Sequence, residues 1–333
     1  MKGKVSRGPA DGACLQGFIL AMRRKNPFIR IYLLIGIFLL GFLGCSKRVT
    51  NGDLPGTPEN GETSRIPAFG TDQTFEIATW NIQNFPKAGE NTLKLLAEII
   101  QSLEIDVYAV QEIQDTLAFR QLMDRLPDYD GIYSADTYSS WYQKTGVIYK
   151  KQQVTLAGRK QLYWNDRFSF PRSPLQVYVS VDFGTVDFDF YLIVLHLKAF
   201  SGAENEDRRR SAVQKLKKYV ENQIAAGADP DFILAGDWND ELTDEDLHNV
   251  FLPFLNNPEQ FIFLTLPLAK NGEVSYYVGN YRSLIDHILI TTSIQQNHPN
   301  IETQIIKLDQ LLSNYYRYVS DHRPVAARIP IGN

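Results

Sequence analysis

Cysteine, net positive charge and long apolar runs are all scarce in this chain of 333 residues. Only Cys14 and Cys45 carry thiols, which excludes a structural zinc centre built from several cysteines. Lys and Arg number 34 against 38 Asp and Glu, a net charge of −4, so the chain is not a basic protein that holds nucleic acid by bulk electrostatics. The 44% hydrophobic and 22% charged residues indicate a globular protein with one or two cores.

The N-terminal segment has the charge and hydropathy pattern of an export signal. Residues 1–44 carry seven Lys or Arg and one Asp, and they end in an uncharged run, residues 31–44, too short to be a comfortable membrane span. Gly44 followed by Cys45 resembles the end of a bacterial lipoprotein signal, in which the cysteine is lipidated and becomes the mature N-terminus. An uncleaved signal anchor or a buried helix is the alternative, and Met22 gives a more conventional start. We therefore expect export, with attachment to a bacterial cell-envelope membrane through a lipid on Cys45, or secretion.

Cleavage would leave an acidic domain behind a flexible tether. Without residues 1–44, the chain keeps 27 Lys and Arg and 37 Asp and Glu, a net charge of −10. Cys14 would be lost too, so the mature chain could form no intramolecular disulfide. Residues 45–73 are rich in Gly, Pro, Thr and Asn and predict a tether, with a long ordered loop as the alternative. Residues 74–333 contain no second linker and predict one domain.

Strands and helices alternate along this domain, which indicates an α/β fold. Apolar residues recur at helical spacing in three segments, residues 91–103, 115–126 and 205–226. Period-two alternation or short apolar runs predict strands at residues 75–82, 106–113, 146–151, 154–163, 175–183, 189–199, 231–239, 283–291 and 322–331.

Many of these strands deliver polar side chains where an apolar run ends. The clusters are Trp80-Asn81, Gln111-Glu112, His196, Asp237-Trp238-Asn239-Asp240, Asp286-His287 and Ser320-Asp321-His322. Acids at the ends of buried strands are costly unless they are solvated or bind a metal, so their number predicts a divalent cation site. Carboxylates and amides without thiols favour Mg²⁺, with Mn²⁺ or Ca²⁺ as alternatives, over structural zinc. A Mg²⁺ site of this kind indicates phosphoryl chemistry.

An ordered series of short motifs resembles the endonuclease/exonuclease/phosphatase superfamily. The motifs are TWNIQNF (79–85), VQE (110–112), GVIY (146–149), FPRSP (170–174), LHLK (195–198), AGDWND (235–240), IDHI (285–288) and SDHRPV (320–325). Each motif alone is weak evidence, but eight in the family's order span about residues 75–331. The resemblance implies a four-layer α/β sandwich, in which two mixed, mostly antiparallel sheets pack face to face between helices.

The same resemblance implies roles for individual residues. Glu112 is expected to be the principal metal ligand, assisted by Asn81 and Asp321. His322 is expected to be the general base or to stabilise the phosphoryl oxygen, and Asp286 to orient it. The remaining implied residues are His196 as the second catalytic histidine, Asp237 and Asn239 as the pair that positions water and phosphate, and Arg172 as a phosphate contact. Asp237 could instead be a turn former with Asn239 as its partner, and Arg172 a solvated edge residue.

Two positions depart from branches of the family. Gln83 stands where the exonuclease III branch has an Asp ligand, which together with His196 argues against an abasic-site repair enzyme. Before GVIY, the deoxyribonuclease I branch has a Glu that orients the second histidine, whereas this chain has Gln143, a potential substitute.

Other polar residues have less specific interpretations. His287 is expected to be a core residue, because its neighbour Asp286 carries the motif. Arg208 to Arg210 are expected to lie on a salt-bridged helical face rather than to clamp nucleic acid. Trp141, Tyr142, Lys144, Tyr276, Tyr277, Tyr281 and Arg282 lie in predicted loops, where they could stack on bases or pack within the loop.

The sequence therefore predicts a metal-dependent phosphodiesterase, with an exported nuclease acting on DNA or RNA as the leading function. The alternative is a phosphoesterase of the same superfamily acting on a phospholipid, in the manner of a sphingomyelinase, or on an inositol phosphate. A non-catalytic binding module is the third possibility. The expected partners are nucleic acid as substrate and a membrane through Cys45, and nothing in the sequence indicates an oligomer.

Overall fold

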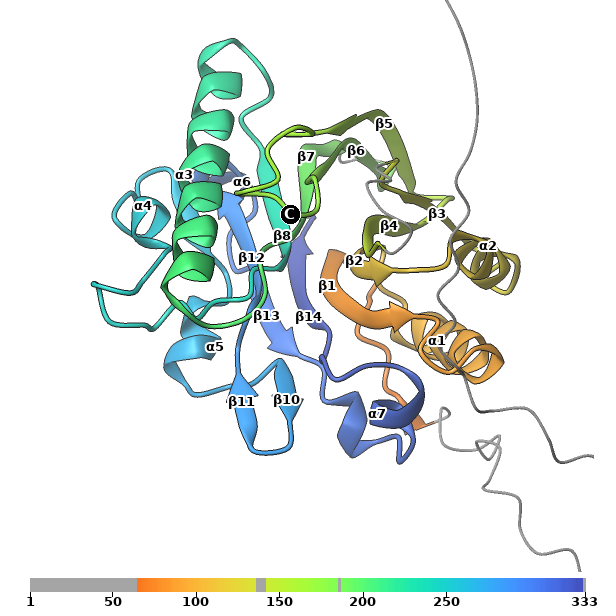
Figure 1. Ribbon diagram of the computed structural model, residues 1–333. Coiled ribbons are helices and arrows are strands. Elements are labelled where there is room, and N and C mark those ends of the chain that lie inside the picture. Colours follow the sequence, from red (N-terminus) through yellow and green to blue (C-terminus); the bar gives the residue numbers. More distant parts are fainter. Residues whose placement is uncertain (1–64, 136–141, 185–186, 332–333) are drawn as a thin grey trace, which may run out of the picture. The chain divides into compact units, whose positions relative to one another are not determined.

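Two six-stranded mixed sheets form the inner layers of the fold in the computed structural model, which describes residues 65–135, 142–184 and 187–331 (Figure 1). In the first sheet the strand order is β13-β14-β1-β2-β4-β3. Its central strands, β1 (Thr74–Phe85) and β2 (Val107–Ile113), pair in parallel and are joined by helix α1 (Glu90–Leu103). The antiparallel strands are β3 (Tyr129–Tyr133), β4 (Lys144–Lys150), β13 (Glu302–Ile305) and β14 (Val325–Pro330).

The second sheet has the same plan. Its order is β5-β6-β7-β8-β12-β9, with β7 (Asp187–His196) and β8 (Phe232–Asp237) parallel and joined by helix α3 (Ala203–Ala225). The antiparallel strands are β5 (Val154–Gln161), β6 (Leu175–Asp182), β9 (Phe261–Phe263) and β12 (Asp286–Thr291). Each sheet thus places a parallel strand pair at its centre, where the carboxyl ends of two strands lie side by side.

Shorter elements complete the described chain. They are α2 (Thr116–Asp124), α4 (Leu252–Leu255), α5 (Leu266–Lys270), α6 (Thr292–Asn297), α7 (Tyr315–Tyr318), the 3-10 turn Leu308–Gln310, and a hairpin of β10 (Tyr276–Val278) and β11 (Tyr281–Ser283). Within the described residues, no helix is long and apolar enough to span a membrane.

Alternation along the strands explains the layers. In β1, Phe75 and Ile77 enter the core between the sheets, whereas Ala78 and Trp80 face the core under α1 and α2. In β8, Ile233 enters the same central core and its neighbours face α3. Helices therefore cover the outer face of each sheet, with α1 and α2 on one side and α3 on the other (Figure 1). The predicted four-layer α/β sandwich is confirmed.

The residues just before β1 pack on the domain. Residues 65–73, assigned above to the tether, contact the domain: Ile66 and Phe69 are buried in the core, and the N–H of Phe69 donates to the carbonyl of Leu103 at 2.9 Å. Their apolar stretch, residues 66–69, is too short to show a helical or strand period. The predicted signal, Cys45 and residues 46–64 of the tether lie outside the described residues.

Candidate active site

The strand ends singled out in the sequence converge on one cleft of about 920 Å³. We call it the central cleft. Its floor includes the half-buried Glu112 from β2 and the buried His196 from β7, Asp237 from β8 and His322, which precedes β14. Its exposed rim includes Phe200 and Tyr281. The floor therefore draws side chains from both sheets, which only the packing of one sheet on the other can bring together.

Asp237 and His322 on this floor form a buried cluster with Asp286, which lies behind His322. One potential ligand atom from each lies within 4.8 Å of the others, and among the described residues this is the one such group of three. His322 Nδ1 lies 2.8 Å from Asp286 Oδ2, which also accepts a 2.6 Å hydrogen bond from Ser275 Oγ. Asp286 Oδ1 is buried and has no hydrogen-bond partner among the described residues. The oxygen and nitrogen donors of this cluster could hold a divalent metal ion.

Burial and mutual repulsion shift the pKa values of this cluster. Burial, reinforced by the charge of Asp286, raises the pKa of Asp237 from 3.8 to about 7. Burial alone would lower the pKa of His322, but the charge and hydrogen bond of Asp286, with Asp237 and Asp321, raise it to about 10. The imidazole of His322 is therefore charged at neutral pH in the metal-free protein. A cation in the cluster would relieve the carboxylate repulsion, so the donor set fits a divalent ion.

The three metal ligands expected from the resemblance lie around this cluster. Asn81 Nδ2 donates to Glu112 Oε1 at 3.1 Å and to Asp237 Oδ2 at 3.0 Å. Asp321 Oδ1 lies 4.0 Å from His322 Nε2, and its Oδ2 accepts a 2.8 Å hydrogen bond from Gln83 Nε2. Gln83, at the position where one branch of the family has an Asp ligand, thus orients Asp321 in this chain.

His196 lies against the same carboxylates but lacks the partner considered for it. Its Nε2 is 3.6 Å from Asp237 Oδ2 and 3.8 Å from Glu112 Oε1, whereas its Nδ1 is buried without a hydrogen-bond partner among the described residues. Gln143 does not substitute as that partner: it donates to Asn84 Oδ1 at 2.7 Å and accepts from Arg172. Burial, followed by the positive charges of Arg172 and His322, lowers the pKa of His196 well below 6.5 and keeps the ring neutral.

Asp237 forms the turn considered for it and also faces the cluster. Its Oδ1 accepts a 3.0 Å hydrogen bond from the backbone N–H of Asn239, which forms the turn after β8, and its Oδ2 faces the cluster. The amide of Asn239 donates to the carbonyl of Leu197 at 3.3 Å. Arg172 donates to that carbonyl at 3.2 Å and lines the central cleft, so it is not a detached edge residue.

Backbone strain is concentrated beside the carboxylates. Glu112 has φ of 69°, and Gln83 and Asn84 have φ of 37° and 47°, in a region that favours glycine. The pairing of β1 with β2 is irregular at this point, between Asn81 and Phe85. The backbone N–H of Asn84 donates to Glu112 Oε2 at 2.8 Å, so the strained turn fixes this carboxylate. Asn84 lies within the motif TWNIQNF, but the sequence predicted no role for it.

A second contribution missed from the sequence comes from the β10–β11 hairpin. The ring of Tyr276 lies 4.7 Å from the His322 ring between centroids, and Ser275 holds Asp286. Part of the segment predicted as loop is therefore a β-hairpin, and Lys144, also predicted in a loop, begins β4. Trp141 lies outside the described residues. Short strands of three residues give too little alternation to be recognised.

The less specific predictions can be placed as well. His287 lies in the core, as predicted, with Nε2 3.0 Å from the carbonyl of Asp240 and Nδ1 3.1 Å from Thr265 Oγ1. Arg209 pairs with Asp240 at 2.7 Å and Arg210 with Glu206 at 2.6 Å. These arginines are therefore engaged within the protein, as predicted for a salt-bridged face.

Comparison with known proteins agrees with this site. Residues 78–322 match the Endonuclease/Exonuclease/phosphatase family, which covers most of the described domain. The chain belongs to this family and is a phosphoesterase whose buried aspartates and histidine could hold a divalent metal. A search of curated protein sequences gives no match.

Solved structures share the fold at low sequence identity. The human Nocturnin catalytic domain is 20% identical with a TM-score of 0.57, covering 78% of this chain and 95% of its own. A humanized D. rerio TDP2 is 16% identical with a TM-score of 0.56, covering 78% and 99%. A Bacteroides thetaiotaomicron mannosyl-6-phosphatase is 14% identical with a TM-score of 0.52, covering 77% and 99%. These likenesses establish the fold alone.

Proposed function

We propose that this protein is a divalent-metal-dependent phosphoesterase that hydrolyses a small phosphorylated molecule. The observation that carries the proposal is the charge of the central cleft beyond its metal cluster. Four further acids line it, Glu206, Asp240, Glu241 and Asp244, against two arginines, Arg172 and Arg209. Arg209 is already paired with Asp240 and Glu206 with Arg210, so Glu241 and Asp244 are the acids of this set without an ion pair among the described residues. One phosphate can be neutralised by a metal and Arg172, but a chain of phosphates would be repelled.

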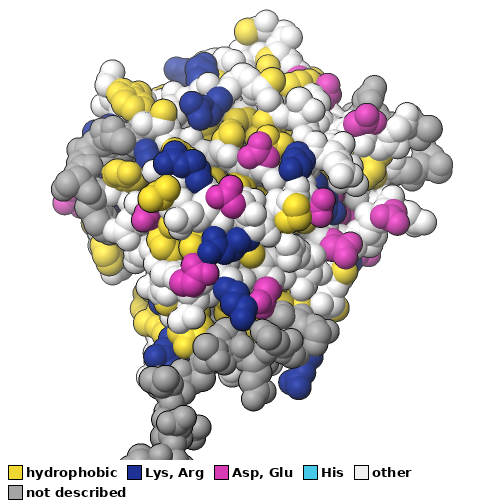
Figure 2. Space-filling view, turned by 90° about the vertical axis from the view of Figure 1, so that its right-hand side faces the viewer, with side chains coloured by type: hydrophobic (Ala, Val, Ile, Leu, Met, Phe, Trp, Pro, Cys, Tyr) yellow, Lys and Arg dark blue, Asp and Glu magenta, His cyan; other side chains and the backbone are white. Residues whose placement is uncertain are grey.

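The face of the molecule on the side of α1 and α2 has no basic patch among the described residues that would compensate for these acids. Figure 2 shows Lys, Arg, Asp and Glu interspersed there. Arg125 on this side, for example, pairs with Glu90 at 2.9 Å. Mixed charges of this kind solvate a helical face and do not attract a polyanion over a distance.

Asp237 and the adjoining Glu112 and Asp321 would hold the metal beside the Asp286–His322 pair, and their oxygen-rich set favours Mg²⁺, with Mn²⁺ or Ca²⁺ as alternatives. A bound divalent ion would stabilise negative charge on the phosphoryl group and lower the pKa of a bound water. The chain's own residues orient the reactants: charged His322 can donate to a phosphoryl oxygen, and neutral His196 can donate a second hydrogen bond.

Asp237 is suited to accept the proton of the attacking water, because its Oδ2 faces the cluster where the phosphoryl group would bind. In the reaction, the water oxygen bonds to phosphorus and the ester P–O bond breaks. The departing alkoxide takes up a proton, which leaves an alcohol and a phosphate with one ester fewer.

A nuclease is the second candidate, because it is the function that the sequence motifs favour. Tyr276 lies beside His322, and Tyr281 is 64% exposed on the rim. Both rings could stack on unpaired bases. The acids of the central cleft argue against strong binding of any polynucleotide, so this candidate requires weak and salt-sensitive activity.

Substrate profiling of the full chain in Mg²⁺ and Mn²⁺ distinguishes the candidates. We expect release of phosphate or alcohol from sugar or inositol phosphates and slow or no cleavage of plasmid DNA and RNA. Glu112→Ala and His322→Ala should abolish the activity, whereas Glu302→Ala, on the exposed edge strand β13, should not. Faster cleavage of plasmid or RNA than of every small ester would favour the nuclease.

We also infer export and lipid attachment at Cys45, from the leader pattern of residues 1–44. Labelling cells with a radioactive fatty acid tests this inference. The full chain should incorporate label and a Cys45→Ser variant should not, and equal labelling of the two would contradict it.

A further inference from the structure

Phe200 is held in a strained conformation on the rim of the central cleft. It is 79% exposed, and its φ of 76° is rare for a bulky residue. Such a conformation costs on the order of 1–3 kcal/mol and persists only when surrounding contacts impose it. An exposed phenylalanine contributes little to the core, so packing of the fold does not account for this cost.

A buried ion pair imposes the conformation. Arg209, 5% exposed on α3, donates from Nη1 to the carbonyls of Lys198 and Phe200, both at 2.9 Å, while its Nε binds Asp240. Lys198 Nζ lies 4.9 Å from the centroid of the Phe200 ring. A cation–π contact at an exposed site contributes about 0.5–1 kcal/mol, which does not offset the strain. The loop is thus built to present an aromatic ring at the cleft.

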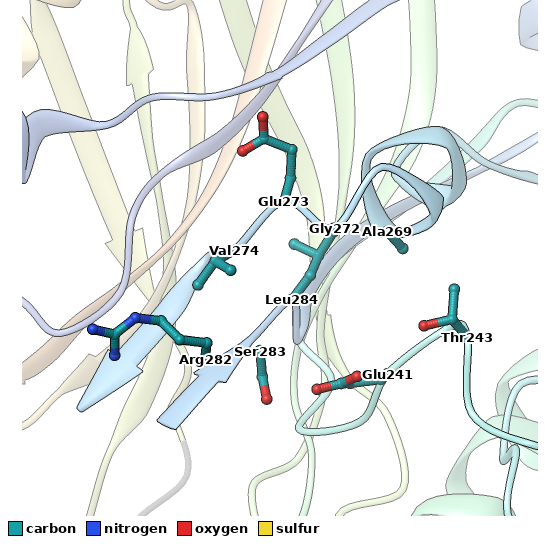
Figure 3. Close-up of a pocket in the computed structure, with 9 residues that line it drawn as sticks. All are labelled: Glu241, Thr243, Ala269, Gly272, Glu273, Val274, Arg282, Ser283 and Leu284. Atoms are coloured by element: carbon teal, nitrogen blue, oxygen red, sulfur yellow. The ribbon is translucent and has the colours of Figure 1, made fainter. Parts of the chain in front are cut away.

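A second cavity of about 260 Å³, shown in Figure 3, borders the central cleft at Glu241. Glu241 and Ser283 line both cavities. In Figure 3 the Glu241 carboxylate points toward Ser283, while the side chains of Arg282 and Glu273 point away. No described residue donates a hydrogen bond to the Glu241 carboxylate, so its oxygens are available to a ligand.

The chemistry of this lining selects a neutral ligand that donates hydrogen bonds. The Glu241 carboxylate can accept hydrogen bonds, and the hydroxyls of Thr243 and Ser283 can donate or accept. Ala269, Val274 and Leu284 supply apolar wall, and the side chains of Glu273 and Arg282 point away from it (Figure 3). A second phosphate would be repelled here, whereas a ring bearing several hydroxyls could place its apolar face on a hydrophobic wall and its edge on the carboxylate.

We propose that Phe200 and the cavity behind Glu241 form a subsite for a neutral polyhydroxylated ring, the organic part of the phosphoester substrate. Phe200 packs on the face of the ring and Glu241 accepts hydrogen bonds from its hydroxyls. The proposal rests on the proposed function, because the phosphate of the same substrate occupies the acid and histidine cluster. A sugar phosphate has this chemistry.

Kinetics of the full chain with a hexose 6-phosphate and with methyl phosphate test the subsite. We expect the wild type to prefer the hexose ester at least tenfold in kcat/KM. Phe200→Ala and Glu241→Ala should each lower this ratio about tenfold, mainly through KM for the hexose ester. Phe168→Ala removes a ring that is 52% exposed outside both cavities and should leave the ratio unchanged.

Thermal unfolding supplies a second readout. Phe200→Gly removes the unfavourable φ, so we expect its Tm to rise by on the order of 2–4 °C while its preference for the hexose ester falls. A fall in both would mean that the ring supports the fold, and would overturn the proposal.

Three kinetic outcomes would also count against it. Equal kcat/KM for the two esters, with no effect of either variant, would overturn the subsite and leave the phosphoesterase intact. If the enzyme prefers a nucleoside 5′-monophosphate to the hexose ester, and this preference depends on Phe200 but not on Glu241, the subsite binds a nucleobase and not a polyhydroxylated ring. No hydrolysis of either ester would instead contradict the proposed function itself.

Discussion

Metal binding should depend on pH through Asp237. In the metal-free protein, burial and the charge of Asp286 raise the pKa of Asp237 to about 7. A metal ligand must be deprotonated, so below this pKa each bound ion displaces a proton from the carboxyl group. Between pH 8 and pH 6 the apparent affinity for Mg²⁺ or Mn²⁺ should therefore fall about tenfold, or about 1.4 kcal/mol. His322, with a pKa of about 10, stays charged across this window and releases no proton.

Isothermal titration calorimetry measures this effect directly. Titrations in two buffers of different ionisation enthalpy should show about 0.9 protons released per metal at pH 6 and about 0.1 at pH 8. Asp166→Asn, which removes a carboxylate paired with Lys215 on α3, should keep the full pH dependence. Equal affinities at pH 6 and pH 8, or proton uptake on binding, would refute the assignment of Asp237 to the metal cluster.

Three further predictions concern single side chains. Asp286→Asn removes the charge that raises the pKa of His322, so an NMR titration should find that pKa at least one unit lower; an unchanged value would contradict the pairing. Glu76 is fully buried in β1, and burial raises its pKa from 4.5 to about 8. The folded state therefore holds this proton more tightly than the unfolded state. The free energy of unfolding should fall as pH rises from 4.5 to 8, by up to about 1.4 kcal/mol per pH unit. Urea unfolding of Glu76→Gln should lack this slope. Tyr315→Phe leaves the indole N–H of Trp80 without its 3.0 Å acceptor and should cost about 1–3 kcal/mol by the same assay, whereas an unchanged midpoint would show that the indole finds another partner.

Long, doubly buried strands were the easiest elements to predict from sequence. The segment that became β1 alternates between two cores, and β8 is a continuous apolar run because helices and the other sheet cover its two faces. The unpredicted strands β3, β9 and β13 are edge strands of three to five residues. An edge strand pairs on one side only, so its extended form depends on the neighbour supplied by the fold rather than on its own pattern.

The sequence by itself determined the chemistry of the site: acids, amides and histidines at strand ends, in the order of one family, with no thiol to compete. The tertiary structure decided how they interact. Asp286 pairs with His322, and Asn81 contacts Asp237, although each pair comes from separate parts of the chain. Gln143 bonds to Asn84 instead of His196. The charge lining the central cleft arises from segments that meet only after the sheets pack, and the strain at Phe200 from the contact of its carbonyl with Arg209 on α3. A linear pattern encodes which side chains a strand delivers, but distances between strands, and the pKa values that follow from them, depend on packing.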